Sequence, residues 1–210
     1  MIKRFFILLA LFMALLIFVA LQQPVKPQPL SGALQKVNSR GETLLPWEGP
    51  WACVYDHQRG LLWEVKTDSE TIHDGYWSYS WFNGAVGKSN GGDCYFEKDR
   101  CDTLDLIQRT NQEKLCGVDG WRLPTVAELR SLIETDVRPD APMIASAFFP
   151  QTRRGDYWTN QHGKPLGATF RYLKEGAVAV SFLDGKTHTL PYRNAAFLRL
   201  VSSEYRKADH

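Results

Sequence analysis

The sequence lacks several short motifs by which enzymes are commonly recognised. It has no His-Glu-x-x-His metalloprotease motif and no glycine-rich phosphate-binding loop. Its five histidines are scattered through polar surroundings, where a lone histidine is more often a surface residue than a base: His57, His73, His162, His188 and His210. These absences predict a protein that is not an enzyme, although a triad assembled only in space stays open.

The net charge is small, at +2, but it is distributed unevenly along the chain. Residues 1–46 carry five basic residues against one acid, residues 47–149 ten against seventeen, and residues 150–210 ten against five, giving +4, −7 and +5. An ordinary solvated surface is one interpretation of the basic last third. The other is a face that attracts polyanions, made from seven candidates: Arg153, Arg154, Lys164, Arg171, Lys174, Lys186 and Arg193.

The N-terminal segment predicts export. Lys3 and Arg4 precede residues 5–21, which contain no charged or strongly polar side chain. A buried core helix is the alternative, but core helices are rarely apolar on every face. Cleavage after Ala20 would place the bulky Phe18 at the −3 position, so we expect an uncleaved anchor in the inner membrane, with a cleaved signal peptide as the alternative. The positive-inside rule then puts the rest of the chain in the periplasm or outside the cell.

Four cysteines lie in the exported part, where disulfides persist: Cys53, Cys94, Cys101 and Cys116. Three pairings are possible. We favour Cys94–Cys101 as a short staple and Cys53–Cys116 as a long one. A zinc site is disfavoured because there is no Cys-x-x-Cys pair and no nearby histidine.

Composition divides the chain into four parts. We expect residues 1–23 to be the signal anchor or signal peptide, 24–46 a proline-rich linker, 47–203 one folded domain and 204–210 a polar tail. Within the domain, patterns of β-branched and aromatic residues predict strands at 51–55, 61–66, 157–159, 168–173, 177–183, 187–190 and 196–201, with turns at 56–60 and 184–185.

Two helices are expected between the early and late strands. The first begins at Asp102 or Thr103. The second has the clearer start, because Pro124 and Thr125 lead into Glu128 with the spacing of a capping box. Strands, two helices and more strands predict an α+β domain.

Motifs spread in order over residues 50–202 resemble the Lcl C-terminal domain family, named for a bacterial collagen-like adhesin. The matching segments are 53–56, 60–64, 101–103, 116–117, 121–125, 128–129, 149–150, 157–159 and 198–201. The resemblance implies an exported bacterial domain and a polyanion-binding adhesion module.

A more distant similarity, over residues 122–128, is to the formylglycine-generating enzyme group. It implies a C-type-lectin-like core with two helices on short antiparallel sheets. The late pair of reactive cysteines that those oxidases need is missing after Cys116, so their activity is not implied. The shared segment also has a structural explanation, as a helix cap with an ion-paired arginine: Trp121, Arg122, Pro124, Thr125 and Glu128.

Two further features allow a ligand. Asp93, Glu97, Asp99, Asp102 and Asp105 offer enough oxygen to interest calcium, but the spacing is not that of an EF-hand and Asp102 is also a candidate helix cap, so we expect no cofactor. Four aromatic residues beside polar loops are either core or a platform for sugar rings: Tyr76, Trp77, Tyr79 and Trp81.

Three functions compete on this evidence. The first is a membrane-anchored binding or adhesion module for a polyanionic glycan. The second is a subunit that holds a protein partner in an envelope assembly, and the third is an enzyme. Nucleic acid is not an expected partner of an exported domain.

Overall fold

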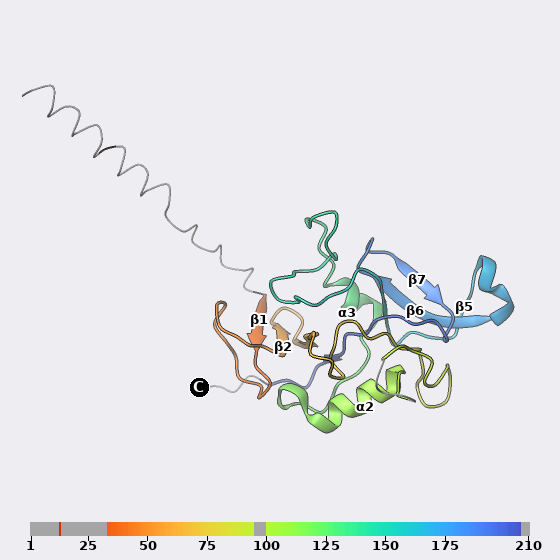
Figure 1. Cartoon of the computed structure of the whole chain (residues 1–210), viewed down its shortest axis with the longest axis horizontal. Helices are drawn as coiled ribbons and strands as arrows, with labels where there is room; N and C mark the ends of the chain where they lie inside the picture. The colour runs from red at the N-terminus through yellow and green to blue at the C-terminus, as the bar shows by residue number, and fades with distance from the viewer. Residues whose placement is uncertain (1–12, 14–32, 95–99, 207–210) are drawn as a thin grey trace, which may run out of the picture. The chain divides into compact units, whose positions relative to one another are not determined.

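The computed structural model describes residues 33–94 and 100–206, together with Met13, and these form a mixed α+β domain with two small antiparallel sheets (Figure 1). Apart from Met13, the hydrophobic segment 5–21 lies outside the described residues. Among the described residues, no helix is long and apolar enough to cross a membrane.

The first sheet has the strand order β1-β2-β3-β8. Its strands are β1 (Leu34–Val37), β2 (Cys53–Asp56), β3 (Leu61–Glu64) and β8 (Val201–Ser202). The expected turn at 56–60 joins β2 to β3, with Gly60 at φ 65° and the Asp56 side chain accepting the Gln58 N–H. All four residues of β3 are buried, so this central strand is covered on both faces.

The structure corrects the predicted linker. Residues 24–46 were expected to be extended, but Leu34–Val37 pairs with β2 along its whole length and Val37 is fully buried. This edge strand has too few apolar residues to be predicted from its own sequence, and it is held in place by its pairing with β2. The predicted tail at 204–210 is also too long, because Tyr205 is buried and donates to the carbonyl of Gly41 at 2.8 Å.

The second sheet is built around β6 (Glu175–Ser181), the longest strand. Three strands pair with it: β4 (Asp156–Trp158), β5 (Lys164–Pro165) and β7 (Thr187–Leu190). The β6–β7 hairpin turns at residues 182–186, as expected from Asp184-Gly185. The register places β5 beside the beginning of β6, and it places the first residue of β4 beside the last residue of β6.

Two predicted strands are wrong. Residues 168–173 form the 3-10 helix η2 (Ala168–Leu173), in which the Phe170 N–H donates to Gly167. An alternating pattern favours a strand only when one face can be buried, and Thr169 to Tyr172 are all exposed. Of the predicted strand 196–201, only Val201 enters a strand, whereas Ala196 and Phe197 make isolated bridges.

The helices lie between the sheets in sequence. They are α2 (Thr103–Glu113), the short 3-10 turn η1 (Leu115–Gly117) and α3 (Val126–Arg130). The Asp102 side chain accepts the Asp105 N–H at 3.0 Å, which confirms the predicted cap of the first helix. The second helix is shorter than its apolar pattern suggests and packs on β6.

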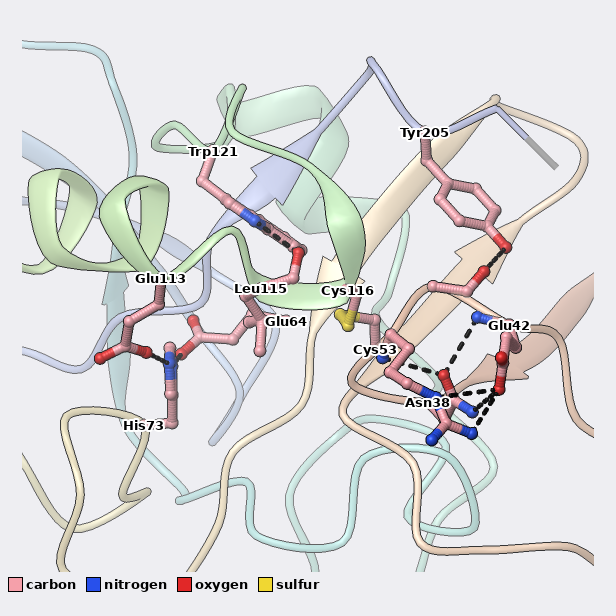
Figure 2. Close-up of a disulfide and its surroundings, with 12 residues drawn as sticks. Asn38, Glu42, Cys53, Glu64, His73, Glu113, Leu115, Cys116, Trp121 and Tyr205 are labelled. Atoms are coloured by element: carbon pink, nitrogen blue, oxygen red, sulfur yellow. Dashed lines mark hydrogen bonds and ion pairs between the residues drawn. A yellow bond between two sulfur atoms is a disulfide. The ribbon is translucent and has the colours of Figure 1, made fainter. Parts of the chain in front are cut away.

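Both disulfides have the favoured pairing, Cys53–Cys116 and Cys94–Cys101. The long bridge joins β2 to η1, next to the turn that carries Asn38 and the C-terminal Tyr205 (Figure 2). Gly41 is required there, since a Cβ would lie 2.7 Å from the Cys116 carbonyl oxygen. Four chain segments therefore meet at the long disulfide.

Large aromatic side chains fill the core. Trp63, Trp121 and Trp158 are buried, while Trp51 is half-buried with its indole N–H donating to Phe148. Of the four aromatic residues considered for sugar stacking, Tyr79 and Trp81 are core and Tyr76 is exposed.

Candidate binding surface

Four of the seven basic candidates gather at the beginning of β6. Lys164 lies on β5 opposite Gly176, and Arg171 and Lys174 belong to η2 and its C-cap. Arg193 follows β7, whose last residue Leu190 pairs with Ala177. We call these four cations, with Phe170 and Tyr172, the basic lobe; β5 and the neighbouring η2 segment lie at the right-hand edge of the domain in Figure 1.

Local contacts hold the lobe on the sheet. The Leu166 N–H donates to the Lys174 carbonyl at 3.0 Å, which closes the segment that contains η2 into a loop. Gly176 lets β7 approach closely, since a Cβ there would lie 2.0 Å from the Leu190 carbonyl oxygen. Tyr192 accepts the Gly163 N–H at 2.9 Å and faces the Glu175 carboxylate at 3.4 Å. The lobe is thus connected to the sheet on both sides.

Beside aromatic rings, the basic lobe places exposed cations that form no ion pair within the described residues. Residues 162–174 contain no acid, and the four cations are exposed. In the described part of the chain, no carboxylate forms an ion pair with any of the four. Tyr172 is 69% exposed and its hydroxyl accepts a hydrogen bond from Arg193 at 2.9 Å, so an aromatic face and a guanidinium are presented together.

The other three basic candidates lie elsewhere. Arg153 and Arg154 precede β4 at the opposite end of β6, and the Arg153 guanidinium covers the ring of Tyr76 at 3.2 Å. Lys186 lies in the β6–β7 turn, paired with Asp184 at 3.0 Å. The seven residues therefore form two groups. In the second group Lys186 has an acidic partner, whereas neither Arg153 nor Arg154 forms an ion pair among the described residues.

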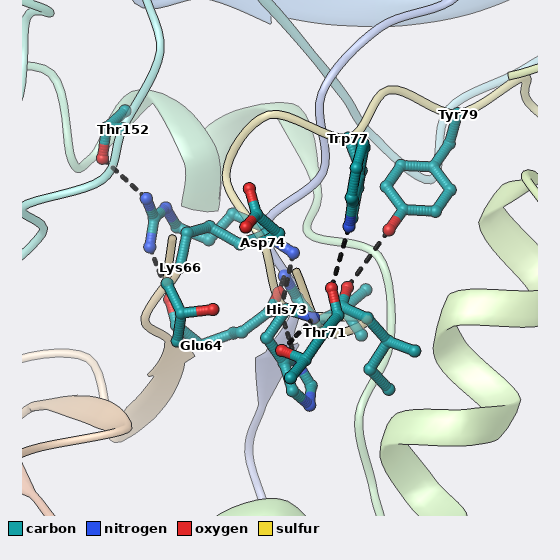
Figure 3. Close-up of polar contacts among 12 residues, drawn as sticks. Glu64, Lys66, Thr71, His73, Asp74, Trp77, Tyr79 and Thr152 are labelled. Atoms are coloured by element: carbon teal, nitrogen blue, oxygen red, sulfur yellow. Dashed lines mark hydrogen bonds and ion pairs between the residues drawn. The ribbon is translucent and has the colours of Figure 1, made fainter. Parts of the chain in front are cut away.

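A second charged group is buried under the first sheet (Figure 3). Glu64 at the end of β3 accepts hydrogen bonds from the Lys66 ammonium and pairs with the His73 ring, both at 2.7 Å, and also accepts the Leu200 N–H at 2.9 Å. The other ring nitrogen of His73 faces Glu113 of α2 at 3.1 Å. Arg199 donates to the Glu64 carbonyl and to Thr152. We call this set the Glu64 cluster.

Opposite charges hold this cluster ionised. Burial alone would raise the pKa of Glu64, but Lys66 and His73 lower it to about 2. Burial would likewise lower the pKa of His73, yet its hydrogen bonds to Glu113 and Glu64 raise it above the ordinary 6.5. Burial lowers the pKa of both Lys66 and Arg199. The cluster is a structural charge network in which Glu64, Lys66 and His73 satisfy one another, while the buried Nε of Arg199 has no hydrogen-bond partner among the described residues.

Sequence reasoning missed this cluster. His73 was interpreted as a surface residue, but it is only 9% exposed. Its partners lie 9 and 40 residues away, on a strand end and on a helix. The one local signal is Lys66, two residues after Glu64 in an otherwise apolar run, which places both side chains on the same face.

The acidic segment does not form a cation site in the described residues, where no group of three or more possible metal ligands occurs. Glu97 and Asp99 lie outside the described residues. Asp102 is engaged twice, with one carboxylate oxygen accepting the Asp105 N–H and the other the Asn90 N–H, both at 3.0 Å.

The segment 122–128 forms the N-terminal cap of helix α3. Thr125 accepts the Glu128 N–H at 3.1 Å, and the Glu128 carboxylate accepts the Thr125 N–H at 2.7 Å, which confirms the capping box. Arg122 holds the same carboxylate through two hydrogen bonds, at 2.9 and 2.7 Å. The Arg122 guanidinium and the Glu128 carboxylate therefore pair with each other.

The letters Gly-x-Ser-x-Gly occur at residues 87–91, without the structure that makes this pattern catalytic. A nucleophile elbow lies between a strand and a helix, whereas Ser89 lies in a loop whose Lys88 N–H donates to Trp81. No histidine within the described residues is hydrogen-bonded to Ser89.

A small hollow of about 10 Å³ lies beside the short disulfide. It is below the roughly 300–1,000 Å³ that is usual for small-molecule sites. Its lining comes from three segments of the chain: Ile72, Trp77, Tyr79, Cys94, Arg100, Asp105, Leu106 and Arg109.

These observations define a disulfide-bonded α+β domain with a buried charge network and an exposed basic lobe. The family model of the Lcl C-terminal domain matches residues 52–202, and the chain therefore belongs to that family. Neither a curated protein nor a solved structure matches the chain significantly.

Proposed function

We propose that the protein is a membrane-anchored binding module of the cell envelope, and that its basic lobe contacts polyanionic glycans without catalysing a reaction. The single observation that carries the proposal is the group of four exposed cations, free of acidic partners, beside the open ring of Tyr172. Membership of the Lcl C-terminal domain family supports an adhesin-like role.

The chemistry of the lobe suits sulfated or carboxylated sugars. Exposed guanidinium and ammonium groups attract their anionic substituents over roughly 10 Å at moderate salt. An aromatic face offers the apolar side of a sugar ring a stacking surface. We propose a C-type-lectin-like arrangement of the core, in which loops and short strands at one edge carry the ligand, and no metal ion or cofactor.

Three features support a binding role over catalysis. Glu128 and Arg122 of the most recognisable motif are used in a helix cap and ion pair. Glu64 and His73 are used in a buried network. The basic lobe is open to solvent, with its cations exposed. The apolar segment 5–21 and the two disulfides support an activity in the periplasm or outside the cell.

The test is retention of the full chain on a heparin-type column at low ionic strength, followed by elution with salt. The double variant K174Q/R193Q should elute at clearly lower salt than the wild type. The matched control is R154Q/K186Q, which makes the same change of two charges at the other end of β6 and should elute close to the wild type.

Two outcomes would contradict the proposal. A wild-type chain that is not retained at low ionic strength has no polyanion site. An equal loss of retention in both double variants shows attraction to overall charge and not to the lobe. In either case, a protein partner in an envelope assembly becomes the better explanation of the exposed Tyr172.

A further inference from the structure

One tryptophan is displayed to solvent by an ordered turn. Trp47 is 77% exposed and the neighbouring Leu45 is 50% exposed. The turn is closed by two hydrogen bonds, because the Glu48 N–H donates to the Leu45 carbonyl at 3.0 Å and the Glu48 carboxylate accepts the Leu45 N–H at 2.8 Å. We call residues 45–50 the Trp47 turn. Every other tryptophan of the described residues is buried or half-buried.

The turn is anchored on the first strand. After β1 the chain runs back along it, with Thr43 bridged to Val37 and the Leu44 N–H donating to the Lys36 carbonyl at 2.9 Å. The Lys36 ammonium then donates to the Pro46 carbonyl at 3.0 Å and lies 3.6 Å above the ring of Trp51. The turn is thus pre-ordered, which lowers the entropy cost of a contact made by Trp47.

The segment that carries the turn has no net charge. Between residues 33 and 50, Lys36 and Arg40 are balanced by Glu42 and Glu48, and Arg40 pairs with Glu42 at 2.9 Å. A partner of the Trp47 turn must therefore be recognised by apolar and aromatic contact. Tryptophan and leucine side by side, with a polar indole N–H, suit the boundary between lipid headgroups and acyl chains.

The sequence also limits how far the start of the domain can lie from a membrane that holds residues 5–21. Only residues 22–32 separate the hydrophobic run 5–21 from the start of the described domain. Eleven residues span at most about 40 Å when fully extended, at roughly 3.3–3.6 Å each. A tether of this length raises the effective concentration of lipid around the turn to about the millimolar range, which strengthens a contact made by only two apolar side chains.

We propose that the Trp47 turn docks on the outer face of the membrane that holds the chain, with Trp47 and Leu45 in the interfacial layer. This inference requires the hydrophobic segment to remain uncleaved, but it does not require the basic lobe to bind a glycan. The turn follows β1 at the left of the domain in Figure 1, whereas β5 and η2 lie at the right, so docking leaves the lobe facing away from the lipid.

The test uses the full chain in phosphatidylcholine vesicles, after flotation has shown that it is membrane-bound. Vesicles with brominated acyl chains should quench part of the tryptophan emission relative to the same lipid without bromine. The quenched part should be absent in W47F, which keeps an aromatic ring but removes the probe. L45S keeps the probe and should reduce the quenching at least twofold.

The matched control is Y172S, which removes the exposed aromatic residue of the basic lobe and should quench as the wild type does. Raising the salt concentration should leave the quenching unchanged, because the turn is neutral. Equal emission in both vesicle types, quenching that persists in W47F, a chain that does not float, or quenching abolished by salt would each overturn the docking proposal. None of these outcomes bears on retention by the heparin-type column.

Discussion

The two sheets use charge in opposite ways. Under the first sheet, Glu64, Lys66 and His73 are buried and each faces an opposite charge. At the beginning of β6 in the second sheet, cations such as Lys174 and Arg193 are exposed without an acidic partner. Buried charge must be neutralised locally, whereas exposed charge is stabilised by water and remains available to a ligand. The charges that stabilise the fold and the charges that we propose for binding therefore lie in separate parts of one small domain.

The largest effect is expected from breaking the buried network. Glu64→Ala would leave Lys66 and the protonated His73 without their shared carboxylate, and loss of one partner of a buried ion pair typically costs about 3–5 kcal/mol. Urea unfolding under non-reducing conditions measures the change. The control, Lys174→Ala in the basic lobe, should stay within about 0.5 kcal/mol of the wild type. Similar small losses in both variants would remove the distinction between the two regions.

Removing the disulfide in the first sheet should likewise cost more stability than removing the other one. Cys53–Cys116 closes 63 residues and ties the first sheet to η1, whereas Cys94–Cys101 closes only 7. Since a longer closed loop restricts the unfolded chain more, the double variant Cys53→Ser/Cys116→Ser should lose about 2–5 kcal/mol, and the Cys94→Ser/Cys101→Ser variant less. Calorimetric melting of both variants checks the order, and equal losses would count against it.

The Glu64 cluster should make the domain less stable at both acid and alkaline pH. Because the folded-state pKa of Glu64 is lowered to about 2, its contribution is present above its ordinary value near 4.5 and is lost as pH falls from there toward 2. The folded-state pKa of His73 is raised, so its contribution is complete below 6.5 and is lost as pH rises through the folded value.

Urea midpoints from pH 2 to 9 measure this profile. His73→Gln should flatten the decline on the alkaline side while leaving the acid decline from Glu64 in place. Neutralising Lys174 should leave the shape of the profile unchanged. An alkaline decline that persists in His73→Gln must come from another group.

Thr125→Ala should have the smallest of these effects. It removes one half of the capping box of α3, a helix that packs on the second sheet, and a lost N-cap costs about 1 kcal/mol. Thr125→Ser, which keeps the accepting oxygen, should lose much less. Binding to the heparin-type column by the folded fraction should be unchanged in both, and abolished binding with intact thermal stability would require residues 122–128 to be reinterpreted as a functional site.

What the sequence revealed depended on how local each signal was. The Thr125–Glu128 cap and the Asp102 cap were predicted because their partners are three residues apart. The 3-10 helix at 168–173 was mistaken for a strand because alternation does not reveal whether a partner strand is present. The pairing of His73 with Glu113 arises only when a loop meets a helix, so no spacing could indicate it.

The basic lobe shows the same limit for a surface. Arg153, Lys186 and Arg193 belong to one basic third of the sequence, but only the register of β5, β6 and β7 decides which cations become neighbours. Composition thus identified the sign of the charge, and strand pairing determined where it gathers.

The Cys53–Cys116 bridge also has a mechanical consequence. Under the proposed function, a load between a membrane anchor at the N-terminus and a ligand on the basic lobe would enter through β1 and β2 and cross directly from Cys53 to Cys116. Residues 54–115, which could extend by about 200 Å at roughly 3.3 Å each, lie outside that path. With the bridge intact, tension cannot extend residues 54–115, whereas reduction would make that length available once the domain unfolds under load.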